Sequence, residues 1–370
     1  MIGLLAALLV LSWHRSKPVP PSPKLPLQAR IGQMLLVCFD GTELPLSHPL
    51  QRDIQTHHLG GVMLRSRSPA IPAASGNIVS PQQLRALTRS LQAASPTPLL
   101  IAVDQEGGAV CRLKQRDGFP PTTSFAELGR RNDPALTRQR STEIAQTLQR
   151  YGINFNFSPV VDLNRNPANP VIGALDRSFS DHPESVTAHA AQVVAAHRNY
   201  GIATCLKHFP GHGSSADDSH HGFVDISASW TNTELLPFAN LIQADLADSI
   251  MTSHVYNGRL DPALPATLSS PVLTDLLRGK LGFTGVIISD DLKMDAISAF
   301  YPYAEAVERA IIAGVDILLI CDNNEATVNH TVSLIHDLVL KGRINEQRID
   351  EAYRRISRLK SRLYKSLSTD

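Results

Sequence analysis

The sequence lacks several features that would assign it quickly to a functional class. Its 370 residues carry a formal net charge of +1 and no basic stripe, which gives no reason to expect a nucleic-acid partner. No G-x-G-x-x-G follows the first apolar run, and no Walker lysine loop occurs in the chain. The usual fingerprints of dinucleotide- and nucleotide-binding folds are therefore missing.

Cysteine is also scarce. The four cysteines, Cys38, Cys111, Cys205 and Cys321, show no C-x-x-C spacing. Three of them lie in or beside apolar runs, so we expect small buried hydrophobic residues. The pattern favours neither a zinc site nor a disulfide framework, although it does not exclude a secreted protein.

Fixed charge is missing from the first 14 residues. Residues 2–11 form an unbroken apolar run, too short for a membrane span but typical of a signal h-region, and a proline-rich spacer follows. A basic n-region and a clear A-x-A cleavage site are absent. We expect an apolar signal or anchor at 1–13, a spacer at 14–29, and an exported or membrane-attached protein. The alternative is a cytoplasmic protein in which this segment is a packing helix or follows a misplaced start.

The rest of the chain alternates apolar runs with helix-like stretches. Eight strand candidates are near-continuous hydrophobic runs, as strands buried on both faces require: Met34–Phe39, Gly61–Leu64, Leu99–Val103, Ile153–Phe157, Ile202–Leu206, Ser249–Thr252, Gly285–Ile288 and Val315–Ile320. This number of strands predicts an α/β fold, a (β/α)8 TIM-type barrel forming a single catalytic domain at 30–365. A doubly wound open sheet is the alternative, but it normally has fewer strands and an early phosphate fingerprint.

Helix starts are marked by capping residues followed by proline. Ser80-Pro81 with Gln83 predicts one helix, and Asp133-Pro134 and Ser270-Pro271 predict two more.

Polar residues follow six of the predicted strands, namely Asp104, Asp162, Lys207-His208, His254, Asp290-Asp291 and Asp322-Asn323-Asn324. Any one of them could be a cap or turn residue. Because barrel enzymes build their sites from the carboxyl ends of strands, their coincidence predicts one shared site at the barrel mouth.

A histidine-dense loop at 208–221 carries the strongest chemical signal. Asp218 lies two residues before His220, and a carboxylate partner can orient an imidazole and stabilise its charged form. His208 and His212 could also ligate a metal, but the intervening Phe-Pro-Gly forbids the helix that would place both rings on one face. Metal binding is therefore a minor interpretation.

Two further stretches carry carboxylates at strand ends. Asp104 is followed by Gly107-Gly108, which would let a ligand approach the backbone. Asp290 and Asp291 end an apolar strand, where one carboxylate can face the mouth and act as a nucleophile towards an anomeric carbon.

At these residues the chain resembles the β-N-acetylhexosaminidases of glycoside hydrolase family 3, from about Gln33 to Leu340. The most specific part of the resemblance is the stretch from Lys207 to Gly213 with Asp218-Ser-His220, and three more stretches match in the same order: 103–108, 176–179 and 289–292. Ala109 and Cys111 depart from the family pattern, and the second α/β domain of many β-glucosidase relatives is not present in the sequence.

The resemblance implies roles for individual residues. Asp290 would be the nucleophile, His220 the acid/base and Asp218 its partner, while the sugar would be bound by Asp104, Arg112, Arg177, Lys207 and His208. It implies a retaining exo-β-N-acetylglucosaminidase that forms a covalent glycosyl-aspartate. Peptidoglycan fragments and chitin oligomers are both open as substrates. No cofactor and no metal are implied, and we expect a monomer.

Other functions remain open from the sequence. The histidine makes a retaining phosphorylase chemically plausible, and the adjacent acids would suit substrate-assisted hydrolysis by the sugar's acetamide. A metal-dependent hydrolase and a non-catalytic sugar- or peptidoglycan-binding barrel are the remaining alternatives.

Overall fold

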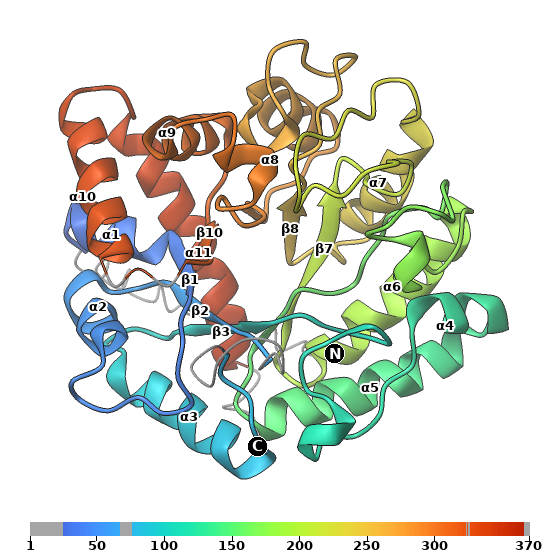
Figure 1. Ribbon diagram of the computed structural model, residues 1–370, viewed down its shortest axis with the longest axis horizontal. Helices are drawn as coiled ribbons and strands as arrows, with labels where there is room; N and C mark the ends of the chain where they lie inside the picture. Colours follow the sequence, from blue (N-terminus) through green and yellow to red (C-terminus); the bar gives the residue numbers. More distant parts are fainter. Residues whose placement is uncertain (1–24, 67–75, 323, 325, 366–370) are drawn as a thin grey trace, which may run out of the picture.

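The computed structural model describes residues 25–66, 76–322, 324 and 326–365. The apolar segment at 1–13, most of the spacer at 14–29, and Asn323 lie outside the described residues. Within them, eight parallel strands form a barrel surrounded by helices (Figure 1). The barrel strands are β1 (Leu35–Cys38), β2 (Gly61–Leu64), β3 (Leu100–Val103), β6 (Phe155–Asn156), β7 (Ala203–Phe209), β8 (Ser249–Thr252), β9 (Val286–Ile288) and β10 (Leu318–Ile320).

The barrel closes between its first and last strands. Its order is β10-β1-β2-β3-β6-β7-β8-β9, and β1 pairs with β10 in parallel register, Leu35 opposite Leu318. A parallel bridge between Ile288 and Ile317 joins β9 to the residue just before β10. The predicted (β/α)8 architecture is therefore confirmed.

Helices and a small hairpin complete the fold. The α-helices are α1 (Leu27–Gln33), α2 (Pro49–His57), α3 (Pro81–Ala94), α4 (Phe125–Arg131), α5 (Pro134–Arg150), α6 (Pro183–Arg198), α7 (Leu236–Gln243), α8 (Asp295–Ser298), α9 (Tyr303–Ala313), α10 (Thr327–Leu340) and α11 (Glu346–Lys365). A π-helix, η5 (Pro271–Lys280), and four 3-10 turns, η1 (Gln115–Asp117), η2 (Gly173–Leu175), η3 (Asn232–Leu235) and η4 (Ala266–Leu268), lie between them. The hairpin consists of β4 (Gln105–Gly107) and β5 (Val110–Cys111).

Two of the three predicted helix caps are confirmed. The Ser80 hydroxyl accepts a hydrogen bond from the Gln83 amide, and the Asp133 carboxylate accepts from the amides of Ala135 and Leu136. Ser270 makes no capping bond, so the third cap is wrong, although the predicted helix does begin at Pro271, as η5. Its neighbour Ser269 provides the hydroxyl that accepts from the Val272 amide, because Ser270 already has helical backbone angles.

The strand that leads into the histidine loop is longer than predicted. β7 continues through Lys207 and His208 to Phe209, so these two polar residues lie within the strand and do not follow it. The strand can extend because Lys207, although buried, has carboxylate partners inside the barrel.

The expectation that no disulfide forms is wrong for two of the cysteines. Cys38 and Cys321 are joined by a disulfide bond, while Cys111 and Cys205 are free and buried. Cys38 ends β1 and Cys321 follows β10, and the pairing register of these neighbouring strands places the two residues opposite each other. The two cysteines are 283 residues apart in the sequence, so local spacing cannot predict that they pair.

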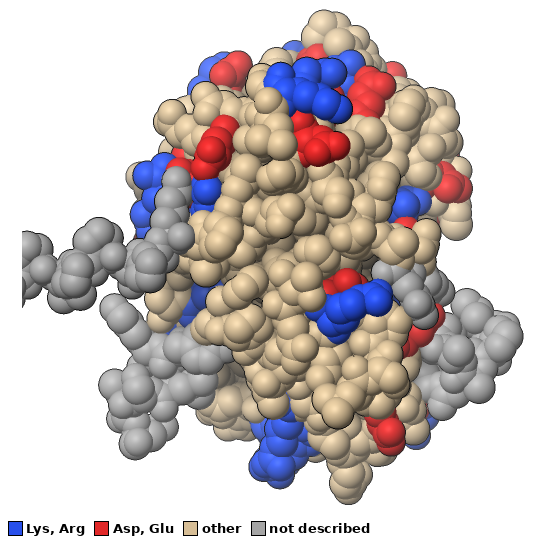
Figure 2. Space-filling model, turned by 90° about the vertical axis from the view of Figure 1, so that its left-hand side faces the viewer, with Lys and Arg blue, Asp and Glu red and all other residues tan. Residues whose placement is uncertain are grey.

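The surface seen in Figure 2 carries basic and acidic side chains in small scattered groups of mixed sign. Among the described helices, none is long and apolar enough to cross a membrane.

Candidate active site

One cavity at the barrel mouth brings together all eight residues predicted to form the site. Its volume is about 220 Å³. The predicted residues that line it are Asp104, Arg112, Arg177, Lys207, His208, Asp218, His220 and Asp290. Apolar side chains from several strands complete the lining, among them Met63, Phe157, Met251 and Leu319.

The floor of the cavity is a buried network of charges. Lys207 Nζ lies 2.7 Å from Asp104 Oδ1 and 2.7 Å from Glu106 Oε1. Arg177 forms a bidentate pair with Glu106, with Nε–Oε2 and Nη2–Oε1 distances of 2.8 and 2.7 Å. Arg112 Nη2 lies 3.0 Å from the second oxygen of Asp104. Two carboxylates thus hold three cations whose donors border the cavity.

These ion pairs fix the charge of each member. Burial opposes ionisation of Asp104, but Lys207 and Arg112 hold its pKa below the ordinary value. Burial likewise opposes ionisation of Glu106, and Arg177 and Lys207 outweigh it and lower that pKa. The pKa of Lys207 is raised, because its two carboxylate partners outweigh the desolvation of its ammonium group.

The β4–β5 hairpin positions two of these residues. Gly107 and Gly108 turn the chain with φ angles of +111° and +61°, and a Cβ on Gly107 would lie 2.3 Å from the carbonyl oxygen of Thr123. Only glycine fits this turn. The side-chain carbonyl of Gln105 accepts from the Arg112 amide at 3.0 Å, which places Arg112 over Asp104.

Asp162 holds the histidines of β7 and its loop. One carboxylate oxygen lies 2.7 Å from His208 Nδ1, and the other accepts from the His212 amide at 2.8 Å. Burial opposes ionisation of Asp162, but His208 lowers its pKa. The His212 ring instead contacts the hydroxyls of Ser215 and Ser219, and burial lowers its pKa to about 4. The His212 ring is therefore neutral, and its hydrogen bonds link two parts of the loop.

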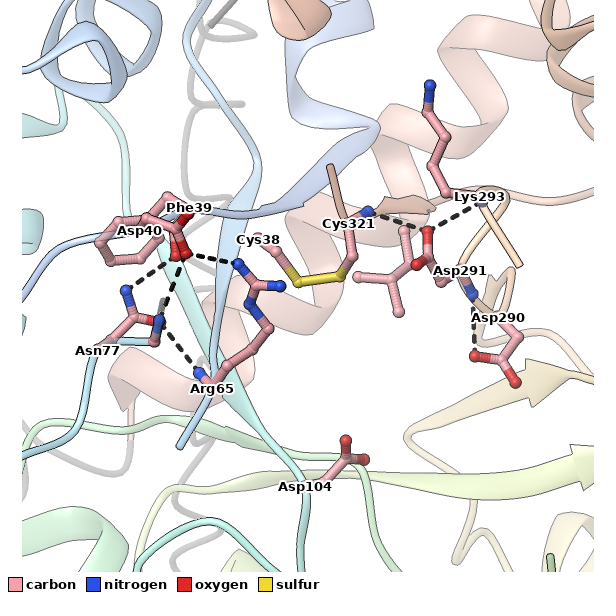
Figure 3. The surroundings of a disulfide bond; sticks show 12 residues. Cys38, Phe39, Asp40, Arg65, Asn77, Asp104, Asp290, Asp291, Lys293 and Cys321 are labelled. Carbon is pink, nitrogen blue, oxygen red and sulfur yellow. Dashed lines mark hydrogen bonds and ion pairs between the residues drawn. A yellow bond between two sulfur atoms is a disulfide. The ribbon is translucent and has the colours of Figure 1, made fainter. Parts of the chain in front are cut away.

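The two adjacent acids after β9 differ in their surroundings, as Figure 3 shows. Asp291 accepts from the amides of Lys293 and Cys321, at 3.0 and 2.9 Å, and burial raises its pKa to about 6. Asp290 lines the cavity, and its Oδ1 accepts from the Asp291 amide at 2.9 Å. Burial opposes ionisation of Asp290, but the imidazoles of His254 and His208 help to lower its pKa. Asp290 is thus an ionised carboxylate facing the cavity, and Asp291 shapes the loop behind it.

The predicted dyad lies at the rim of the cavity. His220 Nδ1 is 2.6 Å from Asp218 Oδ1, and the same oxygen accepts from the His220 amide at 2.8 Å. The His220 side chain is 55% exposed. With Nδ1 bound by Asp218, its Nε2 remains the atom through which the ring can exchange a proton.

Sequence reasoning left the roles of three site residues unassigned. Glu106 and Asp162 contact the predicted residues and orient them, and His254 helps to lower the pKa of Asp290. Asp162 and His254 were visible as polar residues after strands, whereas Glu106 stands inside the unpredicted hairpin. Among the described residues, no group of three or more His, Cys, Asp or Glu side chains is placed to hold a metal ion.

Comparison with known proteins assigns the family. Residues 26–359 match the glycosyl hydrolase family 3 N-terminal domain. The chain belongs to this family of glycoside hydrolases. The resemblance seen in the sequence is thereby confirmed.

Family 3 relatives differ in how much of their length this chain spans. A beta-hexosaminidase from Alkalilimnicola ehrlichii is 39% identical over 302 residues, which cover 79% of this chain and 81% of that protein. Beta-hexosaminidase A from Pseudoalteromonas piscicida is 34% identical over 85% of this chain, which spans only 55% of that relative.

Solved family 3 structures superpose on the whole barrel. A β-N-acetylglucosaminidase from Paenibacillus sp. str. FPU-7 has a TM-score of 0.84 at 36% identity, covering 92% of this chain and 63% of that one. A β-N-acetylhexosaminidase from Beutenbergia cavernae has a TM-score of 0.82 at 30% identity, covering 92% of this chain and 100% of that one.

Proposed function

We propose that this protein is a monomeric retaining exo-β-N-acetylglucosaminidase. It would release terminal N-acetyl-β-hexosamine residues from peptidoglycan fragments or chitin oligomers. The observation that supports this most directly is the meeting of an ionised Asp290 and the Asp218–His220 pair at one sugar-sized cavity. The activities named for the relatives agree with it.

The proposed reaction has two steps. The Asp290 carboxylate attacks the anomeric carbon and forms an ester, while protonated His220 gives its proton to the leaving oxygen as the glycosidic bond breaks. Neutral His220 then takes a proton from water, whose oxygen attacks the same carbon and releases Asp290. Asp218 stabilises the imidazolium of the first step through its contact with Nδ1.

The floor of the cavity supports an exo mode of attack. Asp104, Lys207 and Arg177 close it at the barrel interior with buried ion pairs, so a sugar chain has no exit on that side. Charged donors and acceptors at fixed positions suit the hydroxyl groups of a single terminal sugar.

An assay pair tests the activity. The chromogenic N-acetyl-β-glucosaminide should be turned over much faster than the matching β-glucoside, and NMR should show the β-anomer as the first product. A 2-fluoro sugar should leave a covalent mass on the peptide that contains Asp290. If turnover depends on phosphate and releases a sugar phosphate, the enzyme is a phosphorylase and not a hydrolase. An α-anomer as first product would contradict the retaining mechanism.

We also propose that the protein is exported or attached to the membrane through its N-terminal apolar segment. The Cys38–Cys321 disulfide supports this, because structural disulfides persist mainly in oxidising compartments. Fractionation of cells that make the full chain should place it in the periplasm, the medium or the membrane. Recovery of an uncleaved product from the cytosol alone would contradict the proposal.

A further inference from the structure

Three aromatic side chains meet at the carboxyl end of the barrel, each from a different loop. Phe223 follows β7, Tyr256 follows β8 and Phe300 follows β9 and α8, neighbouring strands of the barrel (Figure 1). The ring centres of Phe223 and Tyr256 lie 5.3 Å apart, and those of Phe223 and Phe300 lie 5.8 Å apart. We call these three residues the aromatic rim.

The aromatic rim exposes apolar surface that a folded protein would otherwise bury. Phe223 is 48% exposed and Phe300 is 56% exposed. Among the described residues, these are the two phenylalanines with large exposed surfaces, and they contact each other. Because clustered exposed aromatic rings are unfavourable in water, such a cluster marks a binding surface.

Two of these loops, those that carry Phe223 and Tyr256, are fixed to each other. The Tyr256 amide donates to the carbonyl of Val224 at 2.8 Å, and the Ile226 amide donates to the carbonyl of Tyr256 at 2.9 Å. The Tyr256 hydroxyl donates to the carbonyl of Pro262 at 2.9 Å. The rings of Phe223 and Tyr256 therefore form a pre-organised surface.

The chain connects the aromatic rim directly to the dyad. Phe223 comes three residues after His220, which lines the cavity, and Tyr256 comes two residues after His254. In the proposed reaction the leaving group must lie against His220, since His220 protonates its oxygen. Phe223 is therefore carried by the same loop as the residue that the leaving group must contact.

We propose that the aromatic rim binds the leaving-group saccharide, which is the sugar that departs when the glycosidic bond breaks. Rings of this kind pack against the apolar C–H faces of pyranose rings, while the sugar hydroxyls stay in water. This inference rests on the proposed glycosidase activity and adds a second sugar site to it. The substrate is then a saccharide chain, and simple alkyl glycosides lack the contact.

Two substrates with the same terminal sugar separate this contact from catalysis. N,N′-diacetylchitobiose carries a saccharide leaving group, and methyl N-acetyl-β-glucosaminide carries methanol. Both leaving groups are alcohols that need protonation, so both depend on His220. We expect Phe223→Ala and Phe300→Ala each to lower kcat/KM for the disaccharide by about tenfold, as loss of one aromatic contact of about 1.4 kcal/mol would. The methyl glycoside should change by less than twofold.

Matched controls make each outcome decisive. Leu340→Ala, at an exposed apolar side chain at the end of α10, should leave both substrates unchanged. Phe300→Tyr, which keeps the ring, should retain disaccharide turnover. Equal loss on both substrates would mean that the loop and His220 had moved, and loss on neither would remove the saccharide site; either result overturns the inference.

A different occupant would leave a different signature. If a second copy of the chain covered the aromatic rim, sedimentation would show a dimer that Phe300→Ala converts to a monomer without selective loss on the disaccharide, which also overturns the inference. A wild-type protein that cleaves neither substrate would refute the proposed glycosidase itself, and so differs from a failure of the aromatic rim alone.

Discussion

The most constrained side chains of the site are the buried charges on its floor. Glu106 is 1% exposed and serves Arg177 and Lys207 at once. Sequence could place Asp104 and Lys207 in one mouth, because strand ends converge, and the family resemblance added Arg177. It could not assign Glu106, because its role depends on two cations 71 and 101 residues further along the chain.

We expect Glu106→Gln to destabilise the protein by about 3–5 kcal/mol, since it removes one partner from buried ion pairs. Urea unfolding followed by circular dichroism measures this free energy. The control is Glu305→Gln, whose partner Arg309 lies one turn away on the exposed face of α9, and it should change stability by less than about 1 kcal/mol. Equal effects of the two substitutions would show that the floor is not held by Glu106.

The two reacting residues should respond differently to the leaving group. His220→Ala should lose about 10²–10⁴-fold on the disaccharide, the usual range for general acid–base catalysis. With a nitrophenyl N-acetyl-β-glucosaminide as substrate, the same variant should lose less of its first-turnover rate, because nitrophenol leaves with little protonation. Asp290→Ala should lose activity on both substrates, because no other carboxylate replaces the attacking group. Equal losses of His220→Ala on the two substrates would rule out His220 as the acid.

Asp218 should act through His220. Asp218→Asn keeps the shape of the side chain but removes the charge that stabilises the imidazolium, so turnover of the disaccharide should fall while folding is kept. The matched substitution is Asp217→Asn, next to it in the same loop. Comparable losses in both variants would point to general damage of the loop.

At the scale of elements, the eight strands were predictable because each is a short apolar run buried on both faces. The β4–β5 hairpin was not, since Gln105–Gly107 has no strand-like composition and pairs only because two glycines turn the chain back on itself. The extension of β7 through Lys207 and His208 was also hidden. Polar residues normally end a buried strand, and here distant carboxylates allow it to continue.

The loop that carries the dyad rests on the 3-10 turn η3. Gly211 has a φ of +119°, and a Cβ there would lie 2.8 Å from the Glu234 carboxylate. Glu234 is 1% exposed, and burial raises its pKa from an ordinary 4.5 to about 7. The loop therefore packs on a carboxyl group that is protonated below about pH 7 and ionised above it.

Glu234 should make stability depend on pH. The folded state holds its proton more tightly than the unfolded state, so the contribution is full below about pH 4.5 and is lost as pH rises through about 7. We expect Glu234→Gln to raise the free energy of unfolding at pH 8 relative to wild type by about 3 kcal/mol, and to change it little at pH 4.5. Thermal unfolding of both proteins across this range measures the difference. A constant difference at all pH values would contradict the shifted pKa.

At the scale of the whole molecule, the barrel is closed twice between its first and last strands. Backbone pairing joins β1 to β10, and the Cys38–Cys321 bond joins their carboxyl ends near Asp291 (Figure 3). The Cys321 amide also donates to Asp291, whose own amide donates to Asp290. The predicted barrel makes these two strands neighbours. Whether the two cysteines lie opposite each other depends on the register between β1 and β10, and local sequence patterns do not determine that register.

Removing this bond should weaken the fold as a whole, because it closes a loop that contains nearly the entire barrel. The double variant Cys38→Ser/Cys321→Ser should lose about 2–5 kcal/mol of unfolding free energy and show a lower Tm.

Thiol titration in denaturant gives an independent measurement of the same bond. The oxidised wild type should show the two free thiols of Cys111 and Cys205, and the reduced protein should show four. A reducing agent should lower the Tm of the wild type towards that of the double variant and leave the double variant unchanged. Four free thiols in protein isolated without reductant would refute the bond, and the export that it supports would then rest on the N-terminal segment alone.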